Sequence, residues 1–103
     1  EFRRVLFRFV ASAQALPDPQ KLGLTLKVNG KTWQNASTAQ MIFPVAAIIE
    51  FVSAIVTLEP GDIISTGTPS GVGNTTGTYL KPGDQMEAAI EGIGVLRNHM
   101  VAE

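Results

Sequence analysis

Residues 22–30, Leu-Gly-Leu-Thr-Leu-Lys-Val-Asn-Gly, are the stretch that decides the fold. Leucine and valine alternate here with glycine, threonine and lysine, the period of two that is typical of a half-buried β-strand. Asn29-Gly30 ends the strand, and Asn-Gly favours the two-residue type I′ turn because both central residues of that turn take a positive φ. The sequence therefore predicts a β-hairpin whose returning strand covers residues 31–35.

The apolar pattern changes its period from Met41 onward. Hydrophobic residues recur at spacings of three and four as far as Val56, which is the mark of a helix face buried against a core. Pro44 suits the first helical turn, and the Pro60-Gly61 pair stops any helix. This pattern predicts one principal helix over residues 44–57.

The pattern Leu-x-Pro-Gly-Asp occurs twice, at residues 58–62 and 80–84. Proline followed by glycine fits the centre of a type II turn, because proline fixes the first φ and glycine accepts the positive second one. We expect each aspartate to cap its turn, and each turn to launch a strand, over 62–66 and 84–91. The last segment, residues 93–101, is expected to pair back as a second antiparallel hairpin.

The composition describes an ordinary globular segment. The chain has 103 residues, 45% of them hydrophobic and 17% charged, which suffices for one domain. Eight Lys and Arg against nine Asp and Glu give a net charge of −1, so no nucleic-acid partner is expected. The absence of cysteine is typical of a reducing, cytoplasmic environment. No apolar stretch reaches the roughly 20 residues of a membrane span, so no membrane partner is expected.

The chain divides into three parts. Residues 1–9 begin Glu-Phe-Arg-Arg-Val-Leu-Phe-Arg. One frame of a common sequencing-library adapter translates to the same residues, so we interpret 1–9 as non-native. Residues 10–21 contain small residues and two prolines, which predicts a surface linker without a helix. Residues 22–103 are expected to form the folded part.

The glycine-rich stretch 66–78 is the most unusual part of the chain. It is not a P-loop, because that motif needs a lysine after its last glycine and no lysine occurs between Lys31 and Lys81. It does not fit a dinucleotide fingerprint, since residues 74–78 are expected to continue as loop instead of opening a helix. Two interpretations stay open: a flexible connection, or a loop in which Thr66-Gly67-Thr68-Pro69 holds donors toward a ligand oxygen.

Six motifs follow one another along residues 17–103. They are Leu-x-Leu-x-Val-Asn-Gly at 24–30, Gln34 followed by Thr38 and Met41-Ile42-Phe43, Leu-x-Pro-Gly-Asp-Ile-Ile at 58–64, Thr-Gly-Thr-Pro-Ser-Gly-Val-Gly at 66–73, Leu-Lys-Pro-Gly-Asp at 80–84, and Gly-Ile-Gly-Val-Leu-x-Asn at 92–98. Each motif alone is weak. The ordered set resembles the C-terminal half of the fumarylacetoacetate hydrolase family.

The resemblance implies an α+β, β-rich fold: part of a mixed β-roll with one principal helix. It implies that the full-length protein hydrolyses, decarboxylates or isomerises 2-oxo or β-diketo acids at a C–C bond, with acylpyruvates, oxaloacetate or fumarylacetoacetate-like compounds as substrates. In the family the second threonine of the glycine-rich loop lies against the substrate, and it maps to Thr68. Its neighbours Gly67 and Pro69 shape the surface against which the substrate lies. A homodimer is implied as well.

The resemblance also implies what this chain lacks. The family binds Mg²⁺ or Mn²⁺ through a Glu-x-Glu motif and a later aspartate, which would lie upstream together with a lysine and the acid/base residues of a mobile lid. No Glu-x-Glu occurs in this sequence. We therefore expect no metal ligand and no catalytic residue in this chain, and no activity from it alone. The alternatives are a non-catalytic β-rich binding or structural module and, third, a nucleotide binder.

Five further side chains receive structural interpretations. Glu87 and Glu91 are expected to share one strand face as solvated charges and not as metal ligands. His99 lacks a recognisable Asp, Ser or Cys partner and is expected at the surface of the terminal strand. Glu50 suits the solvent-facing edge of the predicted helix, and Trp33 is expected to pack on the hairpin.

Overall fold

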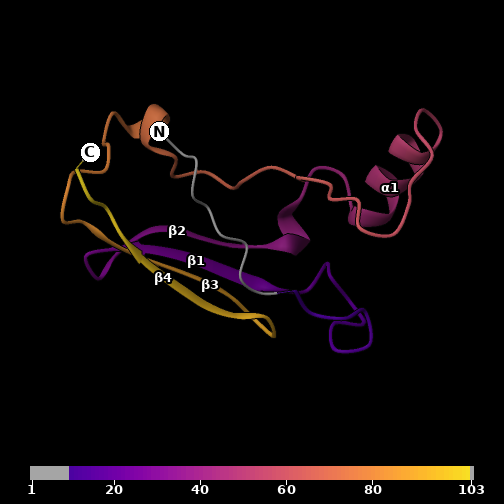
Figure 1. The fold of residues 1–103 in the computed structure, drawn as a ribbon, viewed down its shortest axis with the longest axis horizontal. Helices are drawn as coiled ribbons and strands as arrows, with labels where there is room; N and C mark the ends of the chain where they lie inside the picture. Colours follow the sequence, from indigo (N-terminus) through magenta and orange to yellow (C-terminus); the bar gives the residue numbers. More distant parts are fainter. Residues whose placement is uncertain (1–9, 103) are drawn as a thin grey trace.

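The computed structural model describes residues 10–102 of the chain, so the expected adapter-derived segment 1–9 lies outside the described residues. Four strands form one sheet in the order β2-β1-β3-β4, and every pairing between them is antiparallel. The predicted β-rich α+β fold with one principal helix is confirmed (Figure 1). The elements are β1 Gly23–Val28, β2 Lys31–Ser37, the 3₁₀ helix η1 Thr38–Gln40, α1 Val45–Ser53, α2 Gly73–Thr76, β3 Gln85–Ile90 and β4 Gly94–His99.

The predicted hairpin is confirmed as β1 and β2. Val28 pairs with Lys31 across the turn, and both Asn29 and Gly30 take a positive φ, 51° and 79°, as a type I′ turn requires. The second strand continues to Ser37, two residues beyond the predicted end. The hairpin is therefore set by local turn chemistry and by the alternating pattern of β1.

β2 contains one extra residue opposite β1. Leu26 pairs with Gln34, but the next residue of β1 pairs with Thr32, so Trp33 is left as a β-bulge. Paired residues share a face of the sheet, and an unbroken ladder would place Gln34 opposite Thr25, on the other face. In this chain the bulge thus brings Gln34 to the face of Leu26.

Both Pro-Gly-Asp turns have the predicted chemistry. Gly61 and Gly83 take φ values of 97° and 92°. A positive φ at the third residue is what a type II turn requires. The backbone N–H of Asp62 and that of Asp84 each donate to the carbonyl three residues earlier, at 3.1 Å in both turns. Each carboxylate accepts the N–H of that same earlier residue at 2.8 Å, so both aspartates cap their turns as expected.

The strand expected at 62–66 is wrong. Residues 57–72 contain no strand, and in Figure 1 this segment runs apart from the four strands of the sheet. A strand needs a neighbour for its N–H and C=O groups, which the pattern of a single segment does not reveal. The strand expected at 84–91 is present as β3, Gln85–Ile90, and within the expected segment 93–101 residues Gly94–His99 pair back as β4.

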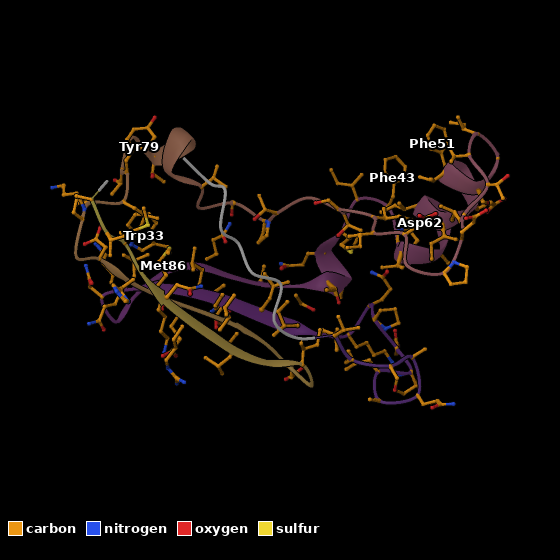
Figure 2. All side chains as sticks on the ribbon, in the orientation of Figure 1. Trp33, Phe43, Phe51, Asp62, Tyr79 and Met86 are labelled. Carbon is orange, nitrogen blue, oxygen red and sulfur yellow. The ribbon has the colours of Figure 1, made fainter. Side chains whose placement is uncertain are left out.

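The principal helix α1 ends at Ser53 and not at residue 57. Its last turn tightens, because the N–H groups of Ile55 and Val56 both donate to the carbonyl of Val52, at 3.0 and 2.9 Å. The predicted burial of the apolar face is also wrong for the described residues: none in α1 is buried, and Phe51 is 69% exposed. Figure 2 shows Phe51 on α1, at the end of the molecule away from the sheet.

The described residues do not enclose a core of their own. Val28, 4% exposed, is the single buried hydrophobic residue among them. The radius of gyration is 15.3 Å, against about 13 Å for a compact domain of 100 residues. Large apolar side chains are exposed, among them those of Ile42, Phe43, Phe51, Ile55 and Ile63. Among residues 10–102, no helix is long and apolar enough to cross a membrane.

Asp84 ties its turn to the hairpin turn. Its carboxylate accepts a hydrogen bond from the side-chain amide of Asn29 at 2.8 Å, and the Asn29 side-chain oxygen accepts the N–H of Gln85 at 3.0 Å. The hydrogen bond from the backbone N–H of Lys81, and then that from Asn29, hold the pKa of the Asp84 carboxyl below its ordinary value. The charged carboxylate is therefore the form that the fold prefers.

We expect Asp84→Asn to lower the stability of the full-length protein at neutral pH more than in acid. The native pKa of Asp84 is depressed, so its contribution is fully present above the unfolded aspartate pKa of about 3.9 and is lost as pH falls through the lower native pKa. Urea unfolding at pH 7 and pH 3 measures the difference. Asp62→Asn is the control, since it alters the equivalent Pro-Gly-Asp turn, to which Asn29 makes no hydrogen bond. An equal loss at both pH values would contradict the role of the charge.

Candidate functional site

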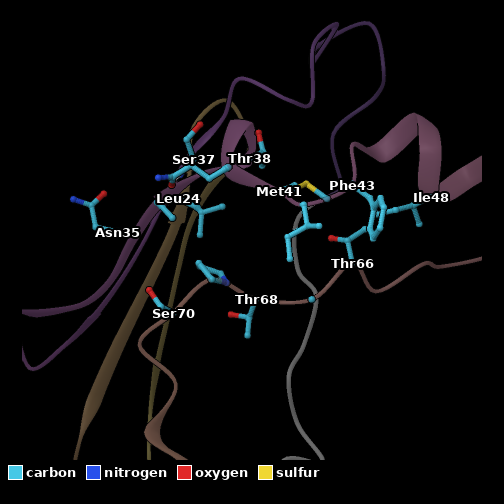
Figure 3. A pocket seen from close by; sticks show the side chains of 15 residues that line it. Leu24, Asn35, Ser37, Thr38, Met41, Phe43, Ile48, Thr66, Thr68 and Ser70 are labelled. Carbon is cyan, nitrogen blue, oxygen red and sulfur yellow. The ribbon is translucent and has the colours of Figure 1, made fainter. Parts of the chain in front are cut away.

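A hollow of about 610 Å³ lies between one end of the sheet and residues 66–70 of the glycine-rich loop. The end of β2, η1 and the start of α1 form the opposite wall. Figure 3 shows Ser37 and Thr38 on the sheet side of the hollow, Thr68 and Ser70 on the loop side, and Phe43 and Ile48 at one end. The hollow thus combines hydroxyl groups with apolar side chains, those of Leu24, Met41, Ile42, Phe43 and Ile48.

The sheet-side hydroxyls are engaged in holding the backbone. Ser37 caps η1, with its Oγ accepting the N–H of Ala39 at 3.1 Å while the Gln40 side chain accepts the N–H of Ser37 at 2.9 Å. Thr38 Oγ1 accepts the N–H of Leu22 at 3.0 Å. These contacts fix the shape of this wall.

The loop wall is fixed from the sheet by one side chain. Gln34 Nε2 lies 2.9 Å from Thr68 Oγ1 and 2.9 Å from the carbonyl oxygen of Pro69. Gly67 takes a φ of 95°, a left-handed conformation that glycine adopts without strain. Thr68 is exposed and Pro69 half-buried, so the loop is anchored at the sheet while the threonine borders the hollow.

Gly71 holds the next part of the loop close to the bulge. Its φ is 105°, and a Cβ built on it would collide with the carbonyl oxygen of Trp33. Only a residue without a side chain can approach the bulge so closely. Trp33 itself is half-buried, as packing on the hairpin predicts. The loop and the bulge are therefore matched in shape.

The structure brings together the three residues that the sequence proposed for substrate contact. Gly67, Thr68 and Pro69 all line the hollow. The contact of Thr68 and Pro69 with Gln34 was not predicted, because Gln34 is 34 residues away from Thr68 and reaches it only through the bulge. The one sequence signal for it is that Gln34 belongs to the second of the six motifs.

The expectation that residues 74–78 continue as loop is wrong in part. Residues 73–76 form the single turn of α2, which Gly77 ends in the left-handed conformation with a φ of 70°. A helix of four residues is too short to carry the dipole of a dinucleotide site, and the lysine of a P-loop is still lacking.

The remaining polar candidates have structural partners or surface positions. Glu87 pairs with Arg97 at 3.0 Å. Glu91 lies beyond the end of β3 and accepts the N–H of Gly23 at 3.2 Å. The expectation that the two glutamates share a strand face is therefore wrong. His99 is exposed at the end of β4, and Glu50 is exposed on α1, as predicted. Across residues 10–102, no three His, Asp or Glu side chains group as a metal centre requires, so the described residues alone do not fit a divalent ion.

Several known proteins are similar to this chain. An uncharacterized protein of Pyrococcus abyssi is 54% identical over 86 residues, which cover 84% of this chain and 36% of the relative. The crystal structure of a maleylpyruvate hydrolase from Sphingobium sp. SYK-6 in complex with manganese(II) and pyruvate matches with a TM-score of 0.80 and 36% identity, over 89% of this chain and 33% of that one.

The fumarylacetoacetate hydrolase of Exiguobacterium antarcticum matches with a TM-score of 0.79 and 43% identity, over 84% of this chain and 32% of that chain. This chain thus spans about a third of the length of the proteins it matches. The family model described as the C-terminal part of fumarylacetoacetate (FAA) hydrolase matches residues 5–101. Because that match covers nearly the whole chain, the chain belongs to the fumarylacetoacetate hydrolase family.

Proposed function

We propose that the full-length protein is a divalent-metal-dependent enzyme that hydrolyses, decarboxylates or isomerises 2-oxo or β-diketo acids at a C–C bond. One observation carries the proposal: the Thr-Gly-Thr-Pro loop borders a hollow of about 610 Å³, with its hydroxyl groups on one wall. Small-molecule sites have volumes of about 300–1,000 Å³ and combine apolar walls with a few fixed polar groups. The hollow has the size and the chemistry for a small acid.

The similar proteins support this substrate class. One of them is named a maleylpyruvate hydrolase and its structure holds manganese(II) and pyruvate, and another is named a fumarylacetoacetate hydrolase. Both names describe acids with keto groups. For the present protein, acylpyruvates, oxaloacetate and fumarylacetoacetate-like acids are accordingly the substrates to test first.

In this proposal the chain supplies one wall of the site. Thr68 contacts the substrate, and Gly67 and Pro69 shape the surface against which it lies. Mg²⁺ or Mn²⁺, when bound, would polarise the oxygens of the substrate. Since the described residues lack a ligand cluster, we propose that the metal is held by residues outside this chain. A cytoplasmic homodimer remains a prediction, to be checked by light scattering and cell fractionation.

We expect a chelator to abolish turnover by the full-length protein and Mn²⁺ or Mg²⁺ to restore it. The reaction is followed by the loss of the acylpyruvate absorbance or by the release of pyruvate from oxaloacetate. Residues 10–103 alone are expected to be inactive under the same conditions. Turnover that survives chelation would contradict the metal dependence.

The two other hypotheses predict different results. A non-catalytic module gives no turnover of any of these acids with either metal. A nucleotide binder gives heat on calorimetric titration with ATP or NAD, whereas the enzyme proposed here gives none.

A further inference from the structure

The orientation of the Gln34 side chain is settled by its two partners. The same atom lies 2.9 Å from the carbonyl oxygen of Pro69 and 2.9 Å from Thr68 Oγ1. A carbonyl oxygen only accepts hydrogen bonds, so this atom must be the amide nitrogen and not the amide oxygen. The nitrogen carries two hydrogens, one for each partner. Gln34 therefore donates to both Pro69 and Thr68.

The direction of this hydrogen bond determines what Thr68 can do. A threonine hydroxyl has one hydrogen to donate and two lone pairs to accept with. When Gln34 occupies a lone pair, the hydroxyl hydrogen remains for a group in the hollow that Thr68 borders. Accepting one hydrogen bond also polarises the hydroxyl and strengthens the one that it donates.

We infer that Gln34 is a positioning residue that presents Thr68 as a hydrogen-bond donor to an acceptor oxygen of the substrate. This inference rests on the proposed function, because it assigns the substrate to the hollow. The oxygen is a carboxylate, carbonyl or enolate oxygen, the groups that a 2-oxo or β-diketo acid carries. An ammonium group at that place has no lone pair to accept the Thr68 hydrogen and would be disfavoured.

The bulge is the structural device behind this arrangement. With the residues that this chain has between Gly30 and Gln34, an unbroken β2 would direct Gln34 to the opposite face, out of reach of the loop. The bulged register places Gln34 on the face of Leu26 and of Leu24, and Leu24 lines the hollow. The carbonyl of the bulged Trp33 in turn meets Gly71, so one irregularity both aims the glutamine and seats the loop.

The test is a double-mutant cycle in the full-length protein. Gln34→Met keeps the length of the side chain without its donors and is expected to lower kcat/KM about tenfold, the cost of the lost hydrogen bond to Thr68; the bond to Pro69 is lost in both backgrounds of the cycle. In a Thr68→Val background the same change is expected to cost less than about twofold, because residues that act as a unit are not additive. Gln85→Leu, an exposed strand residue at the far end of the sheet, is the control and should leave kcat/KM unchanged.

A second variant separates positioning from simple packing. Gln34→Glu keeps the shape but replaces the donor by an acceptor, so the Thr68 hydrogen turns to the new carboxylate and away from the substrate. Its loss of kcat/KM should exceed that of Gln34→Met, with thermal melting reporting that both variants fold. The same double-mutant cycle can be measured without turnover, as the affinity for pyruvate in the presence of Mn²⁺, determined by calorimetry.

The outcomes distinguish this inference from the proposed function. In one set of outcomes Thr68→Val lowers kcat/KM, while Gln34→Met either lowers it equally in both backgrounds or leaves it unchanged. Either result overturns the positioning role of Gln34 but leaves the substrate contact of Thr68 in place. If Thr68→Val changes neither turnover nor pyruvate binding, the wall itself is wrong and the inference falls with it. Loss by Gln34→Met that disappears in the Thr68→Val background supports the inference.

Discussion

Thr68→Val is expected to lower kcat/KM of the full-length protein for a 2-oxo acid by about 100-fold, the cost of removing one pre-positioned donor at a developing charge. Valine has nearly the shape of threonine, so the wall of the hollow keeps its form while the hydroxyl is lost. The Gln34 amide then also lacks its acceptor at Thr68. Steady-state kinetics with acylpyruvate or oxaloacetate measures the loss, and a fall in kcat with little change in KM would assign the hydrogen bond to the transition state.

Two matched variants make this result interpretable. Thr68→Ser retains the hydroxyl and should stay within about tenfold of the native kcat/KM. Thr66→Val removes a hydroxyl from the same loop, one for which the structure gives no hydrogen bond to Gln34, and should cost less than Thr68→Val. Native kcat/KM in Thr68→Val would remove the assigned role of this residue.

Gly71→Ala is expected to detach the glycine-rich loop from the sheet. The new methyl group would collide with the carbonyl oxygen of Trp33, and a φ of 105° is strained for any L-residue, by about 1–3 kcal/mol. The loop can relieve the collision by moving away, which would break the bonds of Gln34 to Thr68 and Pro69. We therefore expect kcat/KM to fall at least about tenfold, since a misplacement of about 1 Å can cost more than that.

Gly77→Ala is the control for backbone strain. Gly77 takes a φ of 70° in the same loop, but a Cβ on it would meet nothing within 4 Å. It should lose only about 1 kcal/mol of stability, with little loss of kcat/KM. Thermal melting and kinetics of both variants separate the two effects. If both behave alike, the contact between Gly71 and Trp33 does not hold the loop in place.

The parts of the fold that the sequence predicted are those decided by neighbouring residues. The Asn29-Gly30 turn, the two Pro-Gly-Asp turns and the pattern of β1 each depend on a few adjacent side chains, and the structure has them all. The strand expected at 62–66 and the buried face of α1 depend instead on what lies beside them. An apolar pattern indicates that a helix face is suited to burial, but it does not indicate which part of the protein covers that face.

The candidate site divides in the same way. Gly67, Thr68 and Pro69 were identified through the order of the motifs, and all three line the hollow. The contact of Gln34 with Thr68 and Pro69 was not predictable, because it depends on a shift of register within β2. Periodicity assumes an unbroken strand, and under that assumption Gln34 falls on the wrong face.

Because of the bulge at Trp33, the number of residues in β2 can change at this point without changing which residue of β2 pairs with Leu26. Deleting that one residue would close the ladder and still leave Gln34 opposite Leu26, whereas deleting one residue within β1 would exchange the faces of its side chains up to the deletion. Loss of the bulged residue would thus keep Gln34 on the face of Leu26, but it would remove the Trp33 carbonyl against which Gly71 of the loop lies. A hairpin without the bulge could therefore still present its glutamine to the loop, but it would have to seat the loop in another way.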